Sequence, residues 1–152
     1  MNILVTGGAG GIGSTLCMML TRNGHTVHAF DNLNNGYLEN LTENGERFCN
    51  LFQADIRASE TVSYILEYYK IDLIVHLAAL TSLPVCESDS RECLSVNVEG
   101  TVSILDAARK RGIKVICAST SAIYENNDPK NAPFTEDLSV SPRLFYPLSK
   151  KI

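Results

Sequence analysis

The chain has 152 residues, of which 45% are hydrophobic, a formal net charge of -4 and a pI near 5.3. This length supports about one compact domain with a sizeable core. An acidic balance without a basic cluster excludes nucleic acid as an expected partner. Five cysteines without a CxxC pair predict neither a disulfide framework nor a zinc site. With no charged leader and no segment of membrane-spanning length, we expect a soluble, cytoplasmic protein with no membrane partner.

Short β-branched runs alternate with helical patterns along the chain, which predicts a parallel sheet. Right-handed crossovers between parallel strands favour a doubly wound, three-layer α/β/α sandwich with ligands at the carboxyl ends of the strands. A long loop is expected only at residues 125–141. The five expected strands are Asn2 to Thr6, Thr26 to Phe30, Phe48 to Gln53, Leu73 to His76 and Lys114 to Ala118.

Three helices are expected between these strands, each with one apolar face. Ser59 is the expected N-cap of the second helix. The apolar faces are expected at Ile12, Leu16, Met19 and Leu20, at Val62, Ile65, Leu66 and Tyr69, and at Leu94, Val98, Val102 and Leu105.

A glycine-rich segment, residues 6–13, separates the first strand from the first helix and contains five glycines in its last seven residues. A pyrophosphate binds free N–H groups at a helix N-terminus only where no Cβ blocks its approach, and glycine also permits turns with positive φ. A plain tight turn is the alternative, because many turns use glycine. The position between a strand and a helix favours a dinucleotide site.

An acidic residue, Asp31, ends the second expected strand, 18 residues beyond Gly13. A carboxylate at this place can accept hydrogen bonds from a ribose diol, and it repels a 2′-phosphate. No arginine or lysine lies within residues 31–35 to attract such a phosphate. NAD is therefore favoured over NADP as the cofactor. The alternative is that Asp31 serves only as a turn former before the asparagines that follow it.

The glycines follow the pattern TGxxGxxG, which resembles the short-chain dehydrogenase/reductase family and implies a Rossmann-type fold. The likeness covers essentially the whole chain and is greatest to the extended, NAD-dependent epimerase/dehydratase branch. Further segments resemble family motifs in the right order, namely Asp55-Ile56, His76-Leu77-Ala78-Ala79, Asn97-Val98-Glu99-Gly100-Thr101, Ser119 to Tyr124 and Tyr146-Pro147-Leu148-Ser149-Lys150.

The resemblance implies the residues of the site. Positions i and i+4 share a helix face, so Lys150 is expected beside the Tyr146 hydroxyl, where it favours the ionised form of this base. Thr120 is the expected third catalytic residue, with Ser121 as the alternative, or it only caps a loop. The residues expected to bind the cofactor are Gly7, Gly10, Gly11, Ile12, Gly13, Asp31, Asn32, Asp55, Ile56, Leu77, Ala78, Ala79, Asn97, Tyr146 and Lys150.

The residues after Thr120 distinguish between activities of the family. Dehydratases carry an Asp-Glu pair there, whereas this chain has Ser121-Ala122, which supplies no acid or base to expel water. The resemblance therefore implies a nucleotide-sugar epimerase, in which hydride leaves a sugar carbon, a keto intermediate forms and hydride returns to the other face. A dehydratase, a reductase or a non-catalytic NAD-binding module remains the alternative.

Two residues and the length of the chain depart from the family pattern. The family usually has Gly where this chain has Glu125, and commonly Gly or Ala where this chain has Pro147. Similar enzymes are roughly twice as long. We therefore expect residues 1–152 to be an incomplete NAD-binding domain, inactive alone, without the substrate domain that binds the nucleotide sugar. An exposed sheet edge is expected to favour association. A homodimer is one form that this association can take. His25, His28 and His76 lack metal-ligand spacing and predict no metal site.

Overall fold

The computed structural model describes residues 1–128, 130 and 132–151. Its internal contacts divide the chain into two compact units. The sheet unit comprises Met1–Ala79 and Glu99–Ala118, and the helical unit comprises Leu80–Val98 and Ser119–Ile152. The incomplete single domain expected over residues 1–152 stays a prediction.

All five expected strands form, and they build one parallel sheet with the order β5-β2-β1-β6-β7. This order places β1 in the centre with crossovers to both sides, which confirms the doubly wound topology. The carboxyl ends of β1 and β2 lie side by side, since Thr6 pairs with Phe30. The strands are β1 (Asn2–Thr6), β2 (Thr26–Asp31), β5 (Asn50–Gln53), β6 (Leu73–His76) and β7 (Lys114–Cys117).

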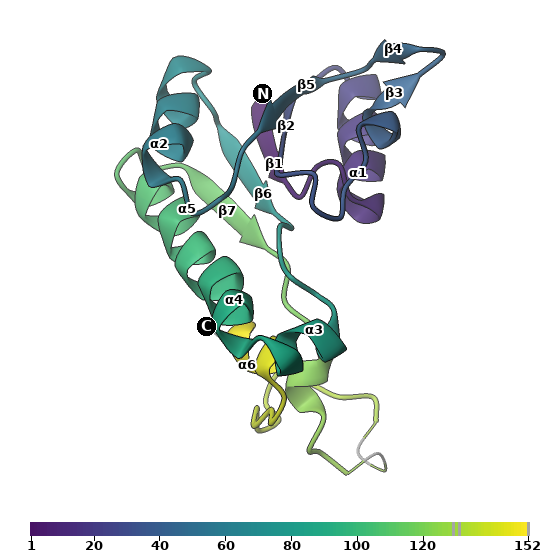
Figure 1. Ribbon diagram of the computed structural model, residues 1–152, viewed down its shortest axis with the longest axis vertical. Coiled ribbons are helices and arrows are strands. Elements are labelled where there is room, and N and C mark those ends of the chain that lie inside the picture. The colour runs from purple at the N-terminus through teal and green to yellow at the C-terminus, as the bar shows by residue number, and fades with distance from the viewer. Residues whose placement is uncertain (129, 131, 152) are drawn as a thin grey trace. The chain divides into compact units, whose positions relative to one another are not determined.

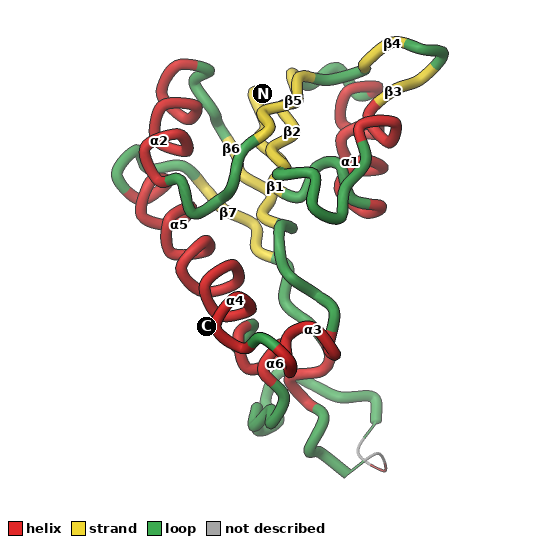
Figure 2. Tube along the Cα trace, in the orientation of Figure 1, coloured by secondary structure: helices red, strands yellow, loops and turns green. Residues whose placement is uncertain are grey.

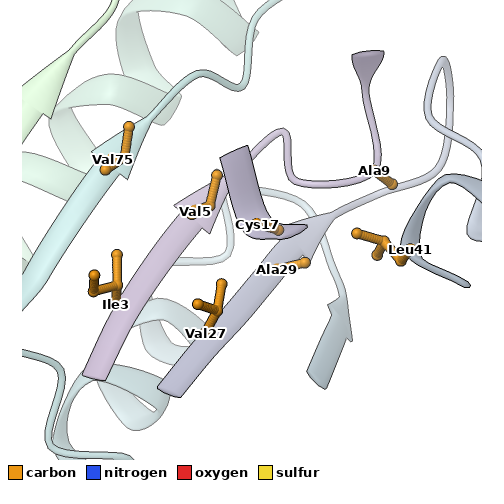
Figure 3. Close-up of a cluster of buried hydrophobic side chains, with 8 residues drawn as sticks. All are labelled: Ile3, Val5, Ala9, Cys17, Val27, Ala29, Leu41 and Val75. Atoms are coloured by element: carbon orange, nitrogen blue, oxygen red, sulfur yellow. The ribbon is translucent and has the colours of Figure 1, made fainter. Parts of the chain in front are cut away.

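Helices cover both faces of this sheet, as Figure 1 shows: α1 (Gly11–Arg22) lies on one face, and α2 (Ser59–Tyr68) and α5 (Gly100–Arg109) lie on the other. Side chains alternate between the faces along each strand. One layer of the core lies under α1 (Figure 3) and consists of Ile3, Val5, Ala9, Cys17, Val27, Ala29, Leu41 and Val75.

The expected apolar face of α1 is partly wrong. Ile12 and Met19 are 79% and 56% exposed, whereas Gly13 and Cys17, four residues apart, are buried. Because Gly13 has no side chain, the start of α1 packs directly on the backbone of the preceding turn, and this close approach turns the small residues inward. Leu16 and Leu20 pack against the core from the flank.

The expected face of the third helix is also partly wrong, since Val102 and Leu105 are 53% and 39% exposed. A π-helical turn, η2 (Ser95–Glu99), interrupts the helix that was expected to run on from Leu94. Such a turn inserts one extra residue and so rotates the residues after it relative to those before it. The buried face of α5 is therefore formed by Gly100, Ile104, Ala107 and Ala108.

Three local predictions also need correction. Ser59 is the first residue of α2 and does not cap it, since the N-cap position belongs to Ala58. The strand expected from Phe48 begins only at Asn50, because Phe48 packs against the core instead of joining the ladder. A short hairpin of β3 (Thr42–Glu43) and β4 (Glu46–Arg47), visible as a separate strand pair in Figure 2, was not predicted.

The helical unit consists of short elements. α3 (Leu83–Ser88), α4 (Ser90–Leu94) and α6 (Phe145–Ser149) contact one another, and the turn η3 (Ser121–Tyr124) contacts α6. Pro147 lies in the first turn of α6, where its missing N–H loses no helical partner. The described part of residues 125–144 holds no strand or α-helix, in agreement with the expected loop. Among the described residues no helix is long and apolar enough to cross a membrane.

Within residues 1–128, 130 and 132–151, the outer strand β7 pairs only with β6, and its Ile116 side chain is 58% exposed. An open strand with an apolar side chain is a template for association. We expect Ile116→Lys to lower the self-association of this chain, measured by light scattering over a range of concentrations. Val102→Lys adds the same charge at an exposed apolar site on α5 and should leave association unchanged. A chain that is monomeric throughout would contradict this prediction.

Candidate functional site

The glycine-rich turn is folded so tightly that two of its glycines leave no room for a side chain. Gly7 has a φ of +69°, and a Cβ there would lie 2.8 Å from the backbone nitrogen of Ala78. A Cβ on Gly13 would overlap the carbonyl oxygen of Gly7. The turn therefore brings the ends of β1 and β6 and the start of α1 into direct backbone contact.

The N-terminus of α1 is open. Its N-cap Gly10 contributes no side-chain hydrogen bond, and its first turn carries no acidic residue. Within the described residues, the backbone N–H groups of Gly11, Ile12 and Gly13 have no hydrogen-bond acceptor. A Cβ on Gly11 would meet nothing within 4 Å. Free N–H groups at the positive end of a twelve-residue helix suit a diphosphate.

Asp31 ends β2 with its carboxylate directed at this turn. One oxygen, Oδ2, accepts a hydrogen bond from the Ala9 N–H at 3.0 Å, and Oδ1 accepts one from the Leu33 N–H at 2.8 Å. Each carboxylate oxygen has two acceptor sites, so one on each oxygen remains for the hydroxyls of a ribose. The turn and the carboxylate thus meet in one place, as the sequence pattern predicted.

The residues that hold this arrangement were not predicted. A Cβ on Gly36 would lie 2.9 Å from Oδ1 of Asp31 and 2.8 Å from the Cβ of Ala9. The Ala9 carbonyl accepts hydrogen bonds from the Tyr37 N–H and from the Asn40 side chain. The only signal in the sequence was an isolated glycine after two asparagines. Residues 36–40 therefore fix the turn from the side of β2.

The next two expected cofactor residues have different surroundings. Asp55 accepts hydrogen bonds from the Arg57 side chain and N–H, and this pairing, with a hydrogen bond from Asn32, holds the pKa of Asp55 below its ordinary value. Asp55 is thus charged at neutral pH and lies next to Asn32, another expected cofactor residue. Ile56 is buried, and its side chain fills the space that a Cβ on Gly100 would need. Only the Ile56 backbone remains for a cofactor.

The segment after β6 is anchored by Thr6, which sequence reasoning also missed. The Thr6 hydroxyl oxygen accepts hydrogen bonds from the N–H groups of Leu77 and Ala78, at 3.2 and 3.1 Å. With both lone pairs used, its own proton goes to Nδ1 of His76 at 2.7 Å. The Nε2–H of His76 then donates to Thr101 at 3.0 Å. His76 is therefore structural, and Ala79 follows this anchored segment.

Asn97 of the helical unit is completely buried. Its amide nitrogen donates to the Leu80 carbonyl at 3.0 Å and to the Ser149 hydroxyl at 2.9 Å, and its side-chain oxygen accepts from the Leu80 N–H. Ser149 lies between Tyr146 and Lys150. Asn97 therefore positions α6, and its expected contact with the cofactor stays a prediction.

The predicted catalytic residues all lie in the helical unit. The Thr120 hydroxyl accepts a hydrogen bond from the Ala122 N–H and so caps η3. Capping of a loop is the role that the sequence offered as the alternative to a catalytic one. Tyr146 lies in α6 and Lys150 is its C-cap residue, and both are half-buried. The Ser119 hydroxyl donates to the Lys150 carbonyl at 3.3 Å, which holds the segment before Thr120 against the end of α6. The fold thus brings these three segments together.

Neither unit offers a metal site among the described residues, which hold no cluster of three metal-ligating side chains. Two cavities in the sheet unit, of about 610 and 490 Å³, are lined by residues at and around α2 and α5 and by none of the glycine turn. The unpaired N–H groups of Gly11, Ile12 and Gly13 lie outside both cavities.

Comparison with known proteins matches residues 3–152 to the NAD dependent epimerase/dehydratase family. A UDP-glucose 4-epimerase of Mycolicibacterium smegmatis is 37% identical over 152 residues, which cover 99% of this chain and 48% of that protein. A UDP-glucose 4-epimerase of Klebsiella pneumoniae is 33% identical over 139 residues, covering 90% of this chain and 99% of that sequence. The crystal structure of a Stenotrophomonas maltophila UDP-glucose-4-epimerase with bound NAD has a TM-score of 0.92 and 30% identity, covering 99% of this chain and 46% of that one.

The chain spans about half the length of most of these relatives, since it covers 48% of the mycobacterial protein and 46% of the crystallised chain. The match to the Klebsiella sequence, 99% of which is covered, is the exception.

The glycine turn provides a matched pair of substitutions. Gly13→Ala places a methyl group on the Gly7 carbonyl, so we expect it to lower the free energy of unfolding by about 2–3 kcal/mol. Gly11→Ala adds the same methyl group in open space and should change it by less than about 1 kcal/mol. Chemical denaturation of both variants measures the difference. Equal losses of stability would show that the turn is less tightly packed than described.

Proposed function

Because the chain belongs to the NAD dependent epimerase/dehydratase family, we propose that it is the NAD-binding half of a nucleotide-sugar epimerase. The observation that carries this proposal is the meeting of the uncapped N-terminus of α1 with the Asp31 carboxylate. Free N–H groups and a ribose acceptor at the end of adjacent parallel strands are what a dinucleotide requires. Two solved relatives of similar fold, named as UDP-glucose 4-epimerases, hold NAD.

In this proposal the sheet unit holds the dinucleotide. The N–H groups of Gly11, Ile12 and Gly13 bind the diphosphate. The Asp31 carboxylate accepts hydrogen bonds from the hydroxyls of the adenosine ribose, and its negative charge repels a 2′-phosphate. Asn32, Asp55 and the Ile56 backbone border the adenine. Gly7, Gly10, Leu77, Ala78 and Ala79 line the path towards the nicotinamide. When bound, NAD supplies an acceptor that takes hydride from the sugar and returns it.

The helical unit contributes the proton chemistry. Tyr146 removes the proton of the reacting sugar hydroxyl, and Lys150 stabilises the resulting tyrosinate by its positive charge. Thr120 positions the same hydroxyl, with Ser121 as the alternative. Asn97 keeps α6 in place through Ser149. Ser121-Ala122 provides no acid–base pair for loss of water, which favours epimerisation over dehydration.

A non-catalytic NAD-binding module is the second candidate, because the glycine turn and Asp31 belong to the sheet unit, which contains none of the predicted catalytic residues. We expect this chain to bind NAD weakly and to convert no sugar nucleotide. The nucleotide sugar is expected as a partner only where a substrate domain accompanies the chain. Interconversion of UDP-glucose and UDP-galactose by residues 1–152 alone would overturn this division of roles.

Cofactor binding is tested by calorimetry of the chain with NAD and with NADP. We expect tighter binding of NAD, and Asp31→Asn should weaken it about tenfold or more because a charged acceptor is lost. The same variant should narrow the difference between NAD and NADP. Asp106→Asn removes an equal charge on the exposed face of α5 and serves as the control. Equal affinity of the unaltered chain for both dinucleotides would contradict the role of Asp31.

Catalysis is tested in a protein that carries this chain together with a substrate-binding domain. Tyr146→Phe should reduce the rate of epimerisation by about 10²–10⁴-fold while NAD stays bound, because only the base is lost. Tyr64→Phe removes an equivalent hydroxyl from an exposed tyrosine on α2 and should leave the rate unchanged. An unimpaired Tyr146→Phe enzyme would exclude this tyrosine as the base.

A further inference from the structure

Four of the five cysteines lie in two pairs of neighbouring thiols that the proposed function does not use. Cys17 pairs with Cys49 in the sheet unit, and Cys86 pairs with Cys93 in the helical unit. All four are free thiols, and the fifth, Cys117, is exposed. The two pairs differ in their access to solvent, and this difference decides what each can do.

The pair in the sheet unit joins a buried thiol to an accessible one. Cys17, on the inner face of α1, is completely buried in the core layer of Figure 3. Cys49 directly precedes β5, packs against the same layer and is half-buried. A surface cavity of about 580 Å³ is lined by Arg47, Phe48 and Cys49. A small solute in this cavity therefore reaches Cys49 but not Cys17.

The surroundings also activate Cys49. The Cys17 thiol next to it lowers the pKa of Cys49, partial burial opposes this, and the Ala29 backbone and the positive charge of Arg47 lower it further, so that the pKa of Cys49 lies below its ordinary value. The neighbouring Cys49 thiol and burial raise the pKa of Cys17. The thiolate is the reactive form of cysteine. Cys49 is thus the nucleophile of the pair, and Cys17 is the thiol held next to it.

The pair in the helical unit has the opposite character. Cys86 and Cys93 are both completely buried. Burial raises the pKa of Cys86 to about 12, and the neighbouring Cys93 thiol and Glu87 carboxylate act in the same direction. No solvent-accessible member is present to meet an oxidant first.

We propose that Cys17 and Cys49 are a redox-sensitive pair that hydroperoxides convert into an intramolecular disulfide, while Cys86 and Cys93 stay reduced. The Cys49 thiolate attacks a peroxide oxygen, the O–O bond breaks, and a sulfenic acid forms as hydroxide leaves. The Cys17 sulfur then attacks the Cys49 sulfur, the S–S bond forms, and the oxygen leaves as water. Two thiols lose two electrons, and one hydrogen peroxide becomes two waters.

The disulfide would join α1, which presents the proposed diphosphate donors, to the residue that directly precedes β5. In the reducing cytoplasm that the sequence predicts for this chain, disulfides are mostly transient and redox-sensing, so a reversible link is the form expected. Thioredoxin or dithiothreitol should restore the two thiols.

In the test, the reduced chain is treated with a small excess of hydrogen peroxide, and the remaining thiols are then blocked. The chain is digested with its disulfides intact, and the peptides are mapped. We expect the mass of two hydrogen atoms to be lost and one cross-linked peptide pair to appear, containing Cys17 and Cys49. Cys17→Ser should stop the reaction at a sulfenic acid on Cys49, which dimedone traps. Cys49→Ser should prevent the reaction.

Two controls separate this proposal from general thiol oxidation. Cys117→Ser removes the exposed thiol and should leave the cross-link unchanged, and so should Cys86→Ser. In the unaltered chain, the rate of iodoacetamide labelling against pH should show Cys49 reacting first, a measurement that needs no variant to fold. A first cross-link between Cys86 and Cys93, or oxidation of Cys49 without any disulfide, would overturn the proposal.

Discussion

The contact between the start of α1 and the Gly7 carbonyl is the constraint on which the rest of the sheet unit depends. It exists only because Gly13 has no side chain. The contact brings α1 close to β1, turns Cys17 into the core and leaves the first N–H groups of the helix without protein acceptors. The same geometry therefore sets the packing of one face of the sheet and creates the donors of the proposed diphosphate site.

Much of this fold follows from local sequence pattern, and the exceptions have physical causes. β1 and β6 begin and end at the predicted residues. The buried faces of α1 and α5 differ from the expected ones because each depends on a feature outside simple periodicity: a glycine contact in one and a π-helical turn in the other. The Asn44-Gly45 dipeptide, in which both residues have a positive φ, is typical of the two-residue turn that joins β3 and β4.

The candidate site shows a similar division. Motif spacing identified Gly7, Gly13 and Asp31, since backbone access and a ribose acceptor need particular residue types. It missed Thr6, Gly36 and Ala9, which act on other segments through hydrogen bonds and close packing. Such roles depend on which segments become neighbours, and a single sequence does not state that. Asn97 was predicted to contact the cofactor, and this stays a prediction. Its second role, a buried amide that links Leu80 to α6, was not predicted.

The Asp31 carboxylate is held in place by two backbone N–H groups before any ligand arrives. If Asp31 accepts the ribose hydroxyls as proposed, binding costs little ordering at this point, because the acceptor is already preorganised. The same two hydrogen bonds restrict how the proposed preference for NAD can change during evolution. Replacing Asp31 with a residue that attracts a 2′-phosphate would also leave the N–H groups of Ala9 and Leu33 without their acceptor. A change of preference from NAD to NADP therefore requires several changes in the surrounding loop and not one substitution.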